Sequence, residues 1–459
     1  MTMSGKRLTG VILASALGLL LCTVDASAQV SAQDAAQLKT TLTPLGAEKA
    51  GNKDGTIPAW DGGLTKPIPG FKQGGRRPDP FANEKPLFSI TAKNMDQYAD
   101  KLTDGTKALF KKYPNTFRVD VYPTHRTEAA PQWVYDNTYR NATRAKLVNG
   151  PAGPQPEGAF GGIPFPIPQN GAEVMWNHLL HWRGTSWHWD QHGYLITADG
   201  KRVLTVDGSA YQQMPYYIED ASPQKWDGDY WDIHMVDAGP PIRAGEGITG
   251  RENINDDRTQ SWVYLTGQRR VRHLPNPCCD TPTPASAGIM GFDDLQVFQG
   301  RLGRFDWKLL GKKEMYIPYN TNKLWVPTHD SDVLGEHHLN PDYLRWELHR
   351  VWIVEATLAK GQRHQVHRGL YYIDEDSWIG IFADRWDAAG RLWKIDWNLV
   401  VVGPDLPGVF DQTHGFYDLV AGSWYANCME NEKSEQYRLV NRYPDSVFTP
   451  DAMAGEGVR

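Results

Sequence analysis

Large apolar residues and polar residues alternate along several stretches in the second half of the chain. In residues 305–309 and 393–399, every second side chain is Phe, Trp, Leu or Ile, and charged or polar residues lie between them. Successive side chains of a β-strand point to opposite faces, so this spacing gathers the apolar side chains on one face. The pattern predicts a sheet with an aromatic-rich face, which either packs a core or lines a pocket for a large apolar molecule.

Turn signals divide this part of the chain into successive strands. Asp199-Gly200 predicts a hairpin over 194–206, and Gly311-Lys312 predicts another over 305–318. Successive hairpins with few helices between them predict a mainly β fold, built on one large antiparallel sheet that is curved or closed. The other predicted strands cover 262–265, 269–272, 345–358, 368–373, 378–384 and 392–401.

Three helices are expected. Residues 91–113 carry apolar side chains near helical spacing, with Thr91 as a cap and Asp104-Gly105 as a point of division. A second helix precedes Gly184, and a short one is expected over 292–300.

Two segments are rich in Pro and Gly. Residues 29–90 have turn residues in nearly every window, so an irregular N-terminal segment is expected there. Residues 151–170 predict a loop and not a strand, lying as an ordered lid or rim. We interpret 29–459 as a single domain.

The first 28 residues predict export. Lys6 and Arg7 precede a short apolar run, and Ala26-Ser27-Ala28 supplies the small residues of a cleavage site. The run is too short to span a bilayer, so a secretory signal peptide is predicted, with the mature protein in a bacterial periplasm. The alternative is lipoprotein processing at Cys22, which the large Leu21 disfavours.

Composition excludes two protein classes. The chain contains 18 Trp and 20 Tyr, which is too aromatic for a disordered protein. Its formal net charge is −6 without a basic stripe, so no nucleic-acid partner is expected. The small basic cluster of 269–273 is interpreted as an outward strand face, with an anionic headgroup as the alternative partner.

Three cysteines remain after the predicted cleavage. Cys278 and Cys279 are adjacent, and adjacent cysteines rarely pair with each other because of strain. In an oxidising compartment, a disulfide from one of them to Cys428 is expected. A soft-metal site at the adjacent pair is the open alternative.

Histidines and acidic residues offer several candidate sites. On a strand, His188, Asp190 and His192 would share a face, as metal ligands can. We interpret them as surface polar residues, and the pairs 178/181, 364/367 and 337/338 as hydrogen-bonding surface histidines. Residues 374–376 are interpreted as a solvated acidic turn. No catalytic residue, metal or cofactor is predicted.

Five long motifs resemble one bacterial periplasmic family of unknown function, whose members are sometimes described as outer-membrane lipoprotein-sorting-like proteins. The motifs occupy 42–63, 161–184, 262–275, 305–320 and 363–378. The resemblance implies an open β-barrel with helices covering a hydrophobic cavity, similar to periplasmic lipoprotein carriers. It also implies two membrane partners, an inner-membrane efflux-type transporter and an outer-membrane protein. The adjacent cysteines depart from the family pattern.

These observations favour a shuttle for a hydrophobic, lipid-like ligand. The alternatives are a periplasmic enzyme acting on a terpenoid- or steroid-like substrate, and a subunit of an envelope transport complex that binds no ligand. The aromatic stripes have two interpretations of equal weight: they form a packed core, or they line a cavity. The predicted cavity residues are Phe305, Trp307, Trp352, Val354, Trp378, Phe382, Trp393, Ile395 and Trp397.

Overall fold

The computed structural model describes residues 1–2, 30–72, 74–150, 152–274, 278–283, 286, 288–434 and 436–456. The predicted cleavage site after Ala28 and the alternative lipidation site at Cys22 lie outside these residues. One hydrophobic cluster extends along the described chain from Leu45 to Tyr437.

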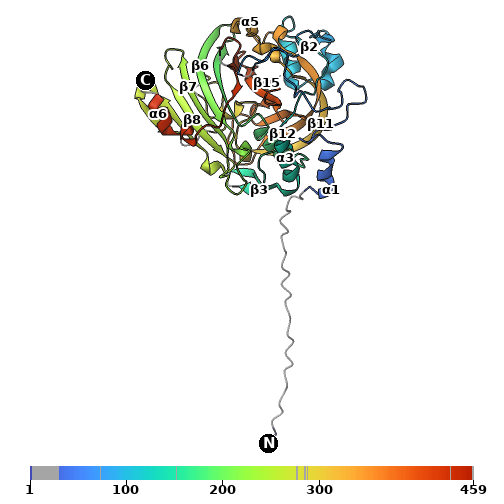
Figure 1. Ribbon diagram of the computed structural model, residues 1–459, viewed down its shortest axis with the longest axis vertical. Coiled ribbons are helices and arrows are strands. Elements are labelled where there is room, and N and C mark those ends of the chain that lie inside the picture. Colours follow the sequence, from blue (N-terminus) through green and yellow to red (C-terminus); the bar gives the residue numbers. More distant parts are fainter. Residues whose placement is uncertain are drawn as a thin grey trace.

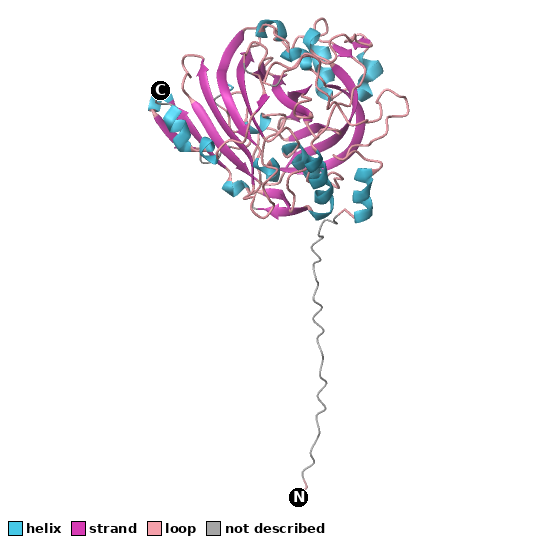
Figure 2. Cartoon of the chain, in the orientation of Figure 1, coloured by secondary structure: helices cyan, strands magenta, loops and turns pink. Residues whose placement is uncertain are grey.

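Strands dominate the structure, as Figure 2 shows. Within the described residues, sixteen of them form one sheet, and β3 (Lys146–Gly150) pairs separately with β4 (Gly153–Glu157). The strands of the large sheet are β1 (Phe88–Ile90), β2 (Val119–Val121), β5 (Ser186–Ile196), β6 (Arg202–Gln213), β7 (Asp229–Gly239), β8 (Gly247–Asn253), β9 (Gln260–Leu265), β10 (Arg270–His273), β11 (Phe305–Pro318), β12 (Trp346–Leu358), β13 (Arg368–Asp374), β14 (Gly380–Trp386), β15 (Leu392–Val402), β16 (Val409–Asp418), β17 (Trp424–Met429) and β18 (Arg438–Leu439).

The large sheet is curved. Its order is β1-β2-β12-β13-β14-β15-β16-β17-β5-β6-β7-β8-β9-β10, with β11 beside β12 and β18 beside β5. All pairs are antiparallel except a single parallel contact between β2 and β12. Figure 1 shows β6, β7 and β8 on one side of the molecule and β11 and β12 on the other. No pairing within the described residues joins β10 back to β1 or β11, so the mainly β fold is confirmed and the barrel is not.

The pairing register defines two faces of this sheet. Val354 pairs with Tyr371, and further pairs continue the same face through Phe416 and Tyr425 to Leu195. On β6 to β9 this face carries Ala210, Met235, Ile248 and Val263. We call it the inner face and the opposite one the outer face.

Short helices lie on both faces. The described α-helices are α1 (Ala32–Ala35), α2 (Asp104–Lys112), α3 (Gln132–Arg144), α4 (Gly171–Leu179), α5 (Asp330–Val333) and α6 (Pro450–Glu456), and 3-10 turns occur at η1 (Ala36–Lys39), η2 (Met95–Lys101), η3 (Pro215–Tyr217), η4 (Asp256–Arg258), η5 (Thr266–Gln268), η7 (Phe292–Asp294), η8 (Leu302–Arg304), η9 (Asn322–Trp325), η10 (Pro341–Tyr343) and η11 (Asp445–Phe448). None of the helices in this described part of the chain combines the length and apolar character needed to cross a membrane.

Helix α4 is buried and packs against the inner face of the curved sheet. Every one of its residues is buried, and Asn170 caps it by accepting the Glu173 N–H. A methyl group at Gly171 would lie 2.9 Å from Val354 on the inner face, so glycine allows the close approach. At the other end, His178 accepts the Gly380 N–H at 2.9 Å.

Other helices cover the outer face. The Gly105 N–H of α2 donates to Asp384 of β14 at 3.0 Å. At the far end of the sheet, Arg251 of β8 donates to the Phe448 carbonyl oxygen at 3.1 Å, which holds the C-terminal segment against β8. Figure 1 shows α6 beside β8. These segments therefore cover the outer face and leave the inner face free of them.

Several predicted elements are confirmed. The expected helix over 91–113 is divided into η2 and α2, and Thr103 caps α2. Thr91 does not cap the first part, because η2 begins after Asn94. The Asp199-Gly200 turn joins β5 to β6, and η5 joins β9 to β10. The described residues between 30 and 90 are mostly irregular.

Three element predictions are wrong. Residues 305–318 form one strand, because Gly311 makes a bulge there and not a turn. The helix before Gly184 ends at Leu179, and 292–300 holds only η7, since Gln296 and Val297 have positive φ angles of 48° and 70°.

The Pro-rich segment also differs from its prediction as a loop without a strand. Pro154 and Pro156 lie in β4, opposite Asn149 and Leu147 of β3. Proline removes a backbone donor, which an edge strand tolerates because one side of it faces no partner strand. Both strands of this two-stranded sheet are edges.

The predicted disulfide is absent. Cys278, Cys279 and Cys428 are buried, and none of them forms a disulfide within the described part of the chain. Cys428 lies in β17, and its thiol donates to Gln191 Oε1 at 2.8 Å. The expectation of a bridge rested on compartment alone, and sequence spacing carries no information on the distance between the thiols.

Residues 374–376 are not a solvated turn. Asp374, Glu375 and Asp376 are buried, with relative exposures of 0%, 2% and 5%. Lys312 pairs with Glu375 at 2.6 Å and Arg126 with Asp376 at 2.6 Å. Cations distant in sequence stabilise these acids inside the fold, and the local pattern does not contain them.

Candidate functional site

A cavity lies against the inner face at the β7–β9 end of the sheet. It encloses about 930 Å³ of empty space, counting the solvent at its mouth. Ligand pockets in proteins are lined mostly by apolar side chains. The apolar side chains around this cavity are Trp231, Ile233, Met235, Ile248, Val263, Leu265, Met290, Phe292 and Leu295.

Strand periodicity explains most of the lining. Trp231, Ile233 and Met235 are alternate residues of β7, so their side chains share the inner face. Met235 pairs with Ile248 of β8, which pairs with Val263 of β9. Three neighbouring strands therefore present one continuous apolar surface.

Small residues keep the floor of the cavity open. Ile233 pairs with Gly250, and Gly250 pairs with Ser261. A methyl group at Gly250 would lie 2.9 Å from the Ser261 hydroxyl, so even alanine would have to displace its neighbour. A row of large side chains here would fill the space between the strands and the covering residues Met290 and Leu295.

Charged residues lie at one end of the cavity. Arg243 contacts Asp237 at 2.5 Å and Glu246 at 3.3 Å. Burial raises the pKa of Asp237 to about 6, and the Arg243 guanidinium opposes that rise. The guanidinium pairs with both carboxylates, so this end of the cavity is polar and can meet the polar part of an amphiphile.

A second polar group faces the cavity at Glu252. Burial, and then repulsion from Asp256, raises the pKa of Glu252 to about 8. Its carboxyl group is therefore mostly protonated near neutral pH and can donate a hydrogen bond. The arrangement suits a largely apolar molecule with few hydrogen-bonding groups.

The adjacent cysteines lie near this end. Cys278 lines a smaller hollow together with Glu252 and Arg301. A hydrogen bond with Cys279 lowers the pKa of Cys278 to about 6, against the effect of burial. The other thiol has a raised pKa, first because it donates that hydrogen bond and then because it is buried.

Sequence comparison decides the family. The family model described as a protein of unknown function (DUF1329) matches residues 89–454. The chain belongs to this family. The prediction from the five motifs is confirmed.

A similar protein matches nearly the whole chain. An uncharacterized protein of Pseudomonas aeruginosa is 40% identical over 455 residues, which is 96% of this chain and 97% of that protein.

Three solved structures are similar to parts of this DUF1329 member. A domain described as an outer membrane lipoprotein-sorting protein of Vibrio parahaemolyticus is 11% identical, covering 62% of this chain and 98% of its own, with a TM-score of 0.43. A DUF1329 family protein of Desulfovibrio piger is 16% identical, with 59% and 92% covered and a TM-score of 0.38. A LolA superfamily protein of Nitrosomonas europaea is 12% identical, with 62% and 100% covered and a TM-score of 0.36.

The nine residues predicted to line a cavity do not share one face. Val354 lies on the inner face, and Trp307 shares it because it pairs with Ala356. Phe382 pairs with Tyr372 and Trp397, which places these side chains on the outer face. Register shifts at 372/373 and 385/386 change the phase between neighbouring strands, so equal parity along the sequence does not mean a shared face.

Aromatic contacts divide the same nine residues into separate groups. Phe305 and Trp307 contact each other on the inner face, with ring centroids 5.7 Å apart. Trp352 stacks on Trp378 at 6.1 Å. Phe382 stacks on Trp346, and Ile395 and Trp397 are buried with exposures of 1% and 2%.

None of these nine described side chains lines the cavity on β7–β9. Trp393, at a bulge position, borders a smaller hollow beside Lys394. The prediction of a single cavity lined by all nine is therefore wrong, because the register divides them between two faces. That any one of them binds a ligand stays a prediction.

The sequence contains one signal for the cavity. Residues 231–235 read Trp-Asp-Ile-His-Met, which alternates in the same way as 393–397. The neighbouring strand β8 contains Gly247 and Gly250, and glycines hide a strand pattern. The cavity is lined by both strands, and only β7 shows the alternation that would reveal it.

Four of the six paired histidines, at positions 178, 181, 338 and 364, form side-chain hydrogen bonds as expected, but all four are buried and do not lie on the surface. His178, His181 and His364 have exposures of 2%, 0% and 8%. Burial lowers the pKa of His178 to about 3, so it stays neutral. His181 bonds Asp411 at 3.1 Å and His364 bonds Asp293 at 2.8 Å, which fits structural roles.

Proposed function

We propose that this DUF1329 protein is a periplasmic binding and shuttle protein for a hydrophobic, lipid-like ligand. The observation that carries the proposal is the apolar cavity formed by the inner face of β7–β9 and its covering residues. Burying apolar ligand surface contributes about 25 cal/mol per Å². A cavity of this kind can hold a lipid chain without a charged contact.

Transport between the inner and outer membranes is part of the same proposal. A carrier must load at one membrane and unload at the other, so it needs partners at both. The family resemblance supports an inner-membrane efflux-type transporter and an outer-membrane protein in these roles. The predicted signal peptide supports the compartment.

Native mass spectrometry of freshly purified periplasmic protein tests the proposal. The expected spectrum contains a population heavier than the polypeptide by the mass of a lipid, which organic extraction removes. Delipidated protein should then bind the fluorescent apolar probe 1-N-phenylnaphthylamine. Protein that carries no lipid, does not bind the probe and co-purifies with membrane proteins would support a non-binding subunit.

Filling the cavity sharpens this test. Ile248→Trp adds an indole ring to the partly exposed cavity wall, so probe binding should fall at least tenfold. Val203→Trp is the matched control, because Val203 is 45% exposed on neighbouring β6 and does not line the cavity. Melting temperatures of both variants should stay near wild type. Loss of fold in Ile248→Trp with unchanged probe binding in the folded fraction would contradict the assignment.

A further inference from the structure

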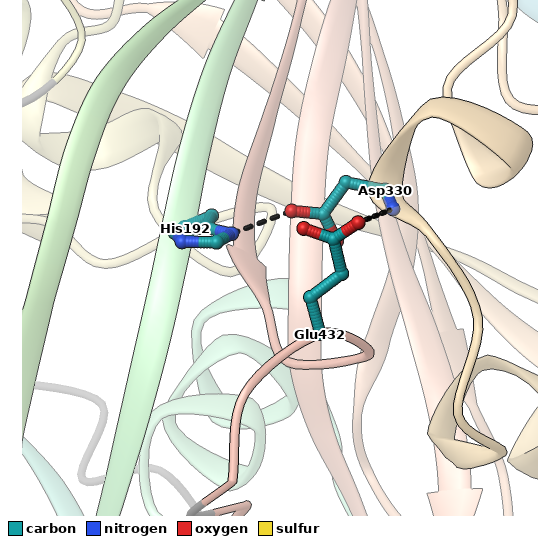
Figure 3. A group of neighbouring side chains, drawn as sticks. All are labelled: His192, Asp330 and Glu432. Carbon is teal, nitrogen blue, oxygen red and sulfur yellow. Dashed lines mark hydrogen bonds and ion pairs between the residues drawn. The ribbon is translucent and has the colours of Figure 1, made fainter.

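A polar site lies on the outer face of the sheet, away from the cavity. His192 of β5, Asp330 at the start of α5 and Glu432 in the loop after β17 converge there (Figure 3). Figure 3 shows the two carboxyl groups beside each other, with the imidazole ring pointing toward them from the strand. Three segments distant in sequence thus meet at one point.

The spacing of the polar atoms suits a metal ion. One ligand atom from each residue lies within 4.8 Å of the other two, and His192 Nδ1 is 2.5 Å from Asp330 Oδ2. Ligand atoms about 2.1 Å from a tetrahedral ion are about 3.4 Å apart. The His192–Asp330 separation is shorter than this value and the other two are at most 4.8 Å, so side-chain movements of an ångström or so would bring all three into coordination distance.

One carboxylate oxygen at the site is buried and has no hydrogen bond. Asp330 is 3% exposed, and its Oδ1 has no hydrogen-bond partner among the described residues. Its other oxygen accepts from Tyr194 at 3.0 Å as well as contacting His192. A buried acceptor without a partner is unfavourable, and a cation would satisfy it.

The local charge is negative. Glu432 Oε1 accepts the Asp330 N–H at 3.0 Å and contacts His329 Nδ1 at 2.9 Å, so it is held against the other carboxylate. The nearby ammonium of Lys433 pairs with a third carboxylate, that of Asp207. Like charges held this close repel each other unless a cation lies between them.

We propose that His192, Asp330 and Glu432 bind a divalent first-row transition ion such as Zn²⁺. One imidazole nitrogen and two carboxylates are a suitable ligand set for this class, with a remaining position for water or His329. The second ring nitrogen of His192 lies 3.8 Å from Asp207, which is too far for a hydrogen bond, but a closer approach would let that carboxylate orient a metal-bound imidazole. The ion would join α5 and the loop after β17 to β5.

Zinc titration of untagged, chelator-treated protein by isothermal titration calorimetry tests the site. Wild-type protein should bind one Zn²⁺ per chain, with a raised melting temperature. Glu432→Gln should weaken binding at least tenfold and remain folded, because this side chain is 33% exposed. Asp332→Asn is the matched control, since it removes one exposed carboxylate from α5, the helix that carries Asp330. This variant should keep the zinc affinity within twofold of wild type.

The substitution His192→Asn provides a second test, with an expected loss of at least tenfold in zinc affinity. Zinc binding that is absent in wild type, or equal in all four proteins, would overturn the proposal. The cavity lies on the opposite face, so Glu432→Gln should leave binding of 1-N-phenylnaphthylamine unchanged. The metal site and the carrier function can therefore fail independently.

Discussion

Buried acidic residues are a prominent feature of this protein at the scale of single residues. Burial, followed by repulsion from Asp229, raises the pKa of Asp232 to about 8. The residue is 4% exposed, and its Oδ1 lacks a hydrogen-bond partner in the described structure. A carboxyl group with a raised pKa stabilises the fold while protonated and loses that contribution as pH rises through the folded pKa.

The substitution Asp232→Asn should therefore stabilise the protein increasingly with pH. Below the unfolded pKa near 4 both proteins should be alike, because the acid is neutral in both states. Between pH 4 and 8 the difference in free energy of unfolding should grow by up to about 1.4 kcal/mol per pH unit. Urea denaturation at several pH values measures it, with exposed Asp227→Asn as the control. A difference independent of pH would contradict the prediction.

Arg385 is a buried cation on which several groups depend. It contacts the carboxylates of Asp294 and Asp396 and donates to the Val297 carbonyl oxygen at 2.6 Å. Both Arg385 and Asp396 have zero exposure. The guanidinium therefore compensates charge that water cannot reach.

Removing this guanidinium should be costly. Arg385→Leu is expected to lower the free energy of unfolding by about 3–5 kcal/mol, since Asp396 would remain buried and unpaired. Arg391→Leu, whose side chain is 64% exposed in its pair with Asp387, should cost less than about 1 kcal/mol. Chemical denaturation compares the two. Equal costs would show that burial of the pair does not matter.

At the scale of elements, the bulge in β11 allows one long strand where a hairpin was expected. β12 pairs with both halves of β11, and the register shifts between Leu309 and Gly311. Gly311 has a φ angle of 108°, which side-chain-bearing residues rarely adopt. The same Gly-Lys dipeptide that signals a turn therefore serves a bulge here.

The substitution Gly311→Ala isolates this backbone effect. A methyl group at Gly311 meets no atom within 4 Å, so steric crowding does not contribute. The strained φ alone should lower the free energy of unfolding by about 1–3 kcal/mol. Gly267→Ala is the control, because that position has equal space and no positive φ. Equal stability of the two variants in urea would argue against strain at the bulge.

At the scale of the whole molecule, the curved sheet separates two environments. The inner face packs against α4 at one end and borders the cavity at the other. The exposed edge strand β10 carries Arg270, Arg272 and His273, all solvent-exposed. Charges on an edge strand hinder pairing with other chains, which suits the interpretation of this cluster as an outward face.

Export is a prediction for the whole chain. The Ala-Ser-Ala site implies a mature N-terminus at Gln29. Intact-mass measurement of periplasmic protein should give the mass of residues 29–459. A mass that includes diacylglyceryl on Cys22 would contradict the prediction and indicate a lipoprotein.

Long motifs made the family predictable from the sequence, and strand periodicity made several strands of the C-terminal half predictable, but not β7, β8, β16 or β17. β12 to β15 lie within a residue or two of their predicted bounds. Alternation is local, because it depends only on the geometry of one extended strand. The sequence by itself therefore determined where strongly alternating strands occur and which residues within one such strand share a face.

Only the tertiary structure decided how those faces combine. Bulges between 309 and 311 and between 398 and 400 shift the register, so neighbouring strands differ in phase. The site at His192 and Asp330 joins residues 138 positions apart, and the cavity needs β7, β8 and β9 together. Such contacts depend on pairing and packing across the whole sheet, and local periodicity contains no information on either.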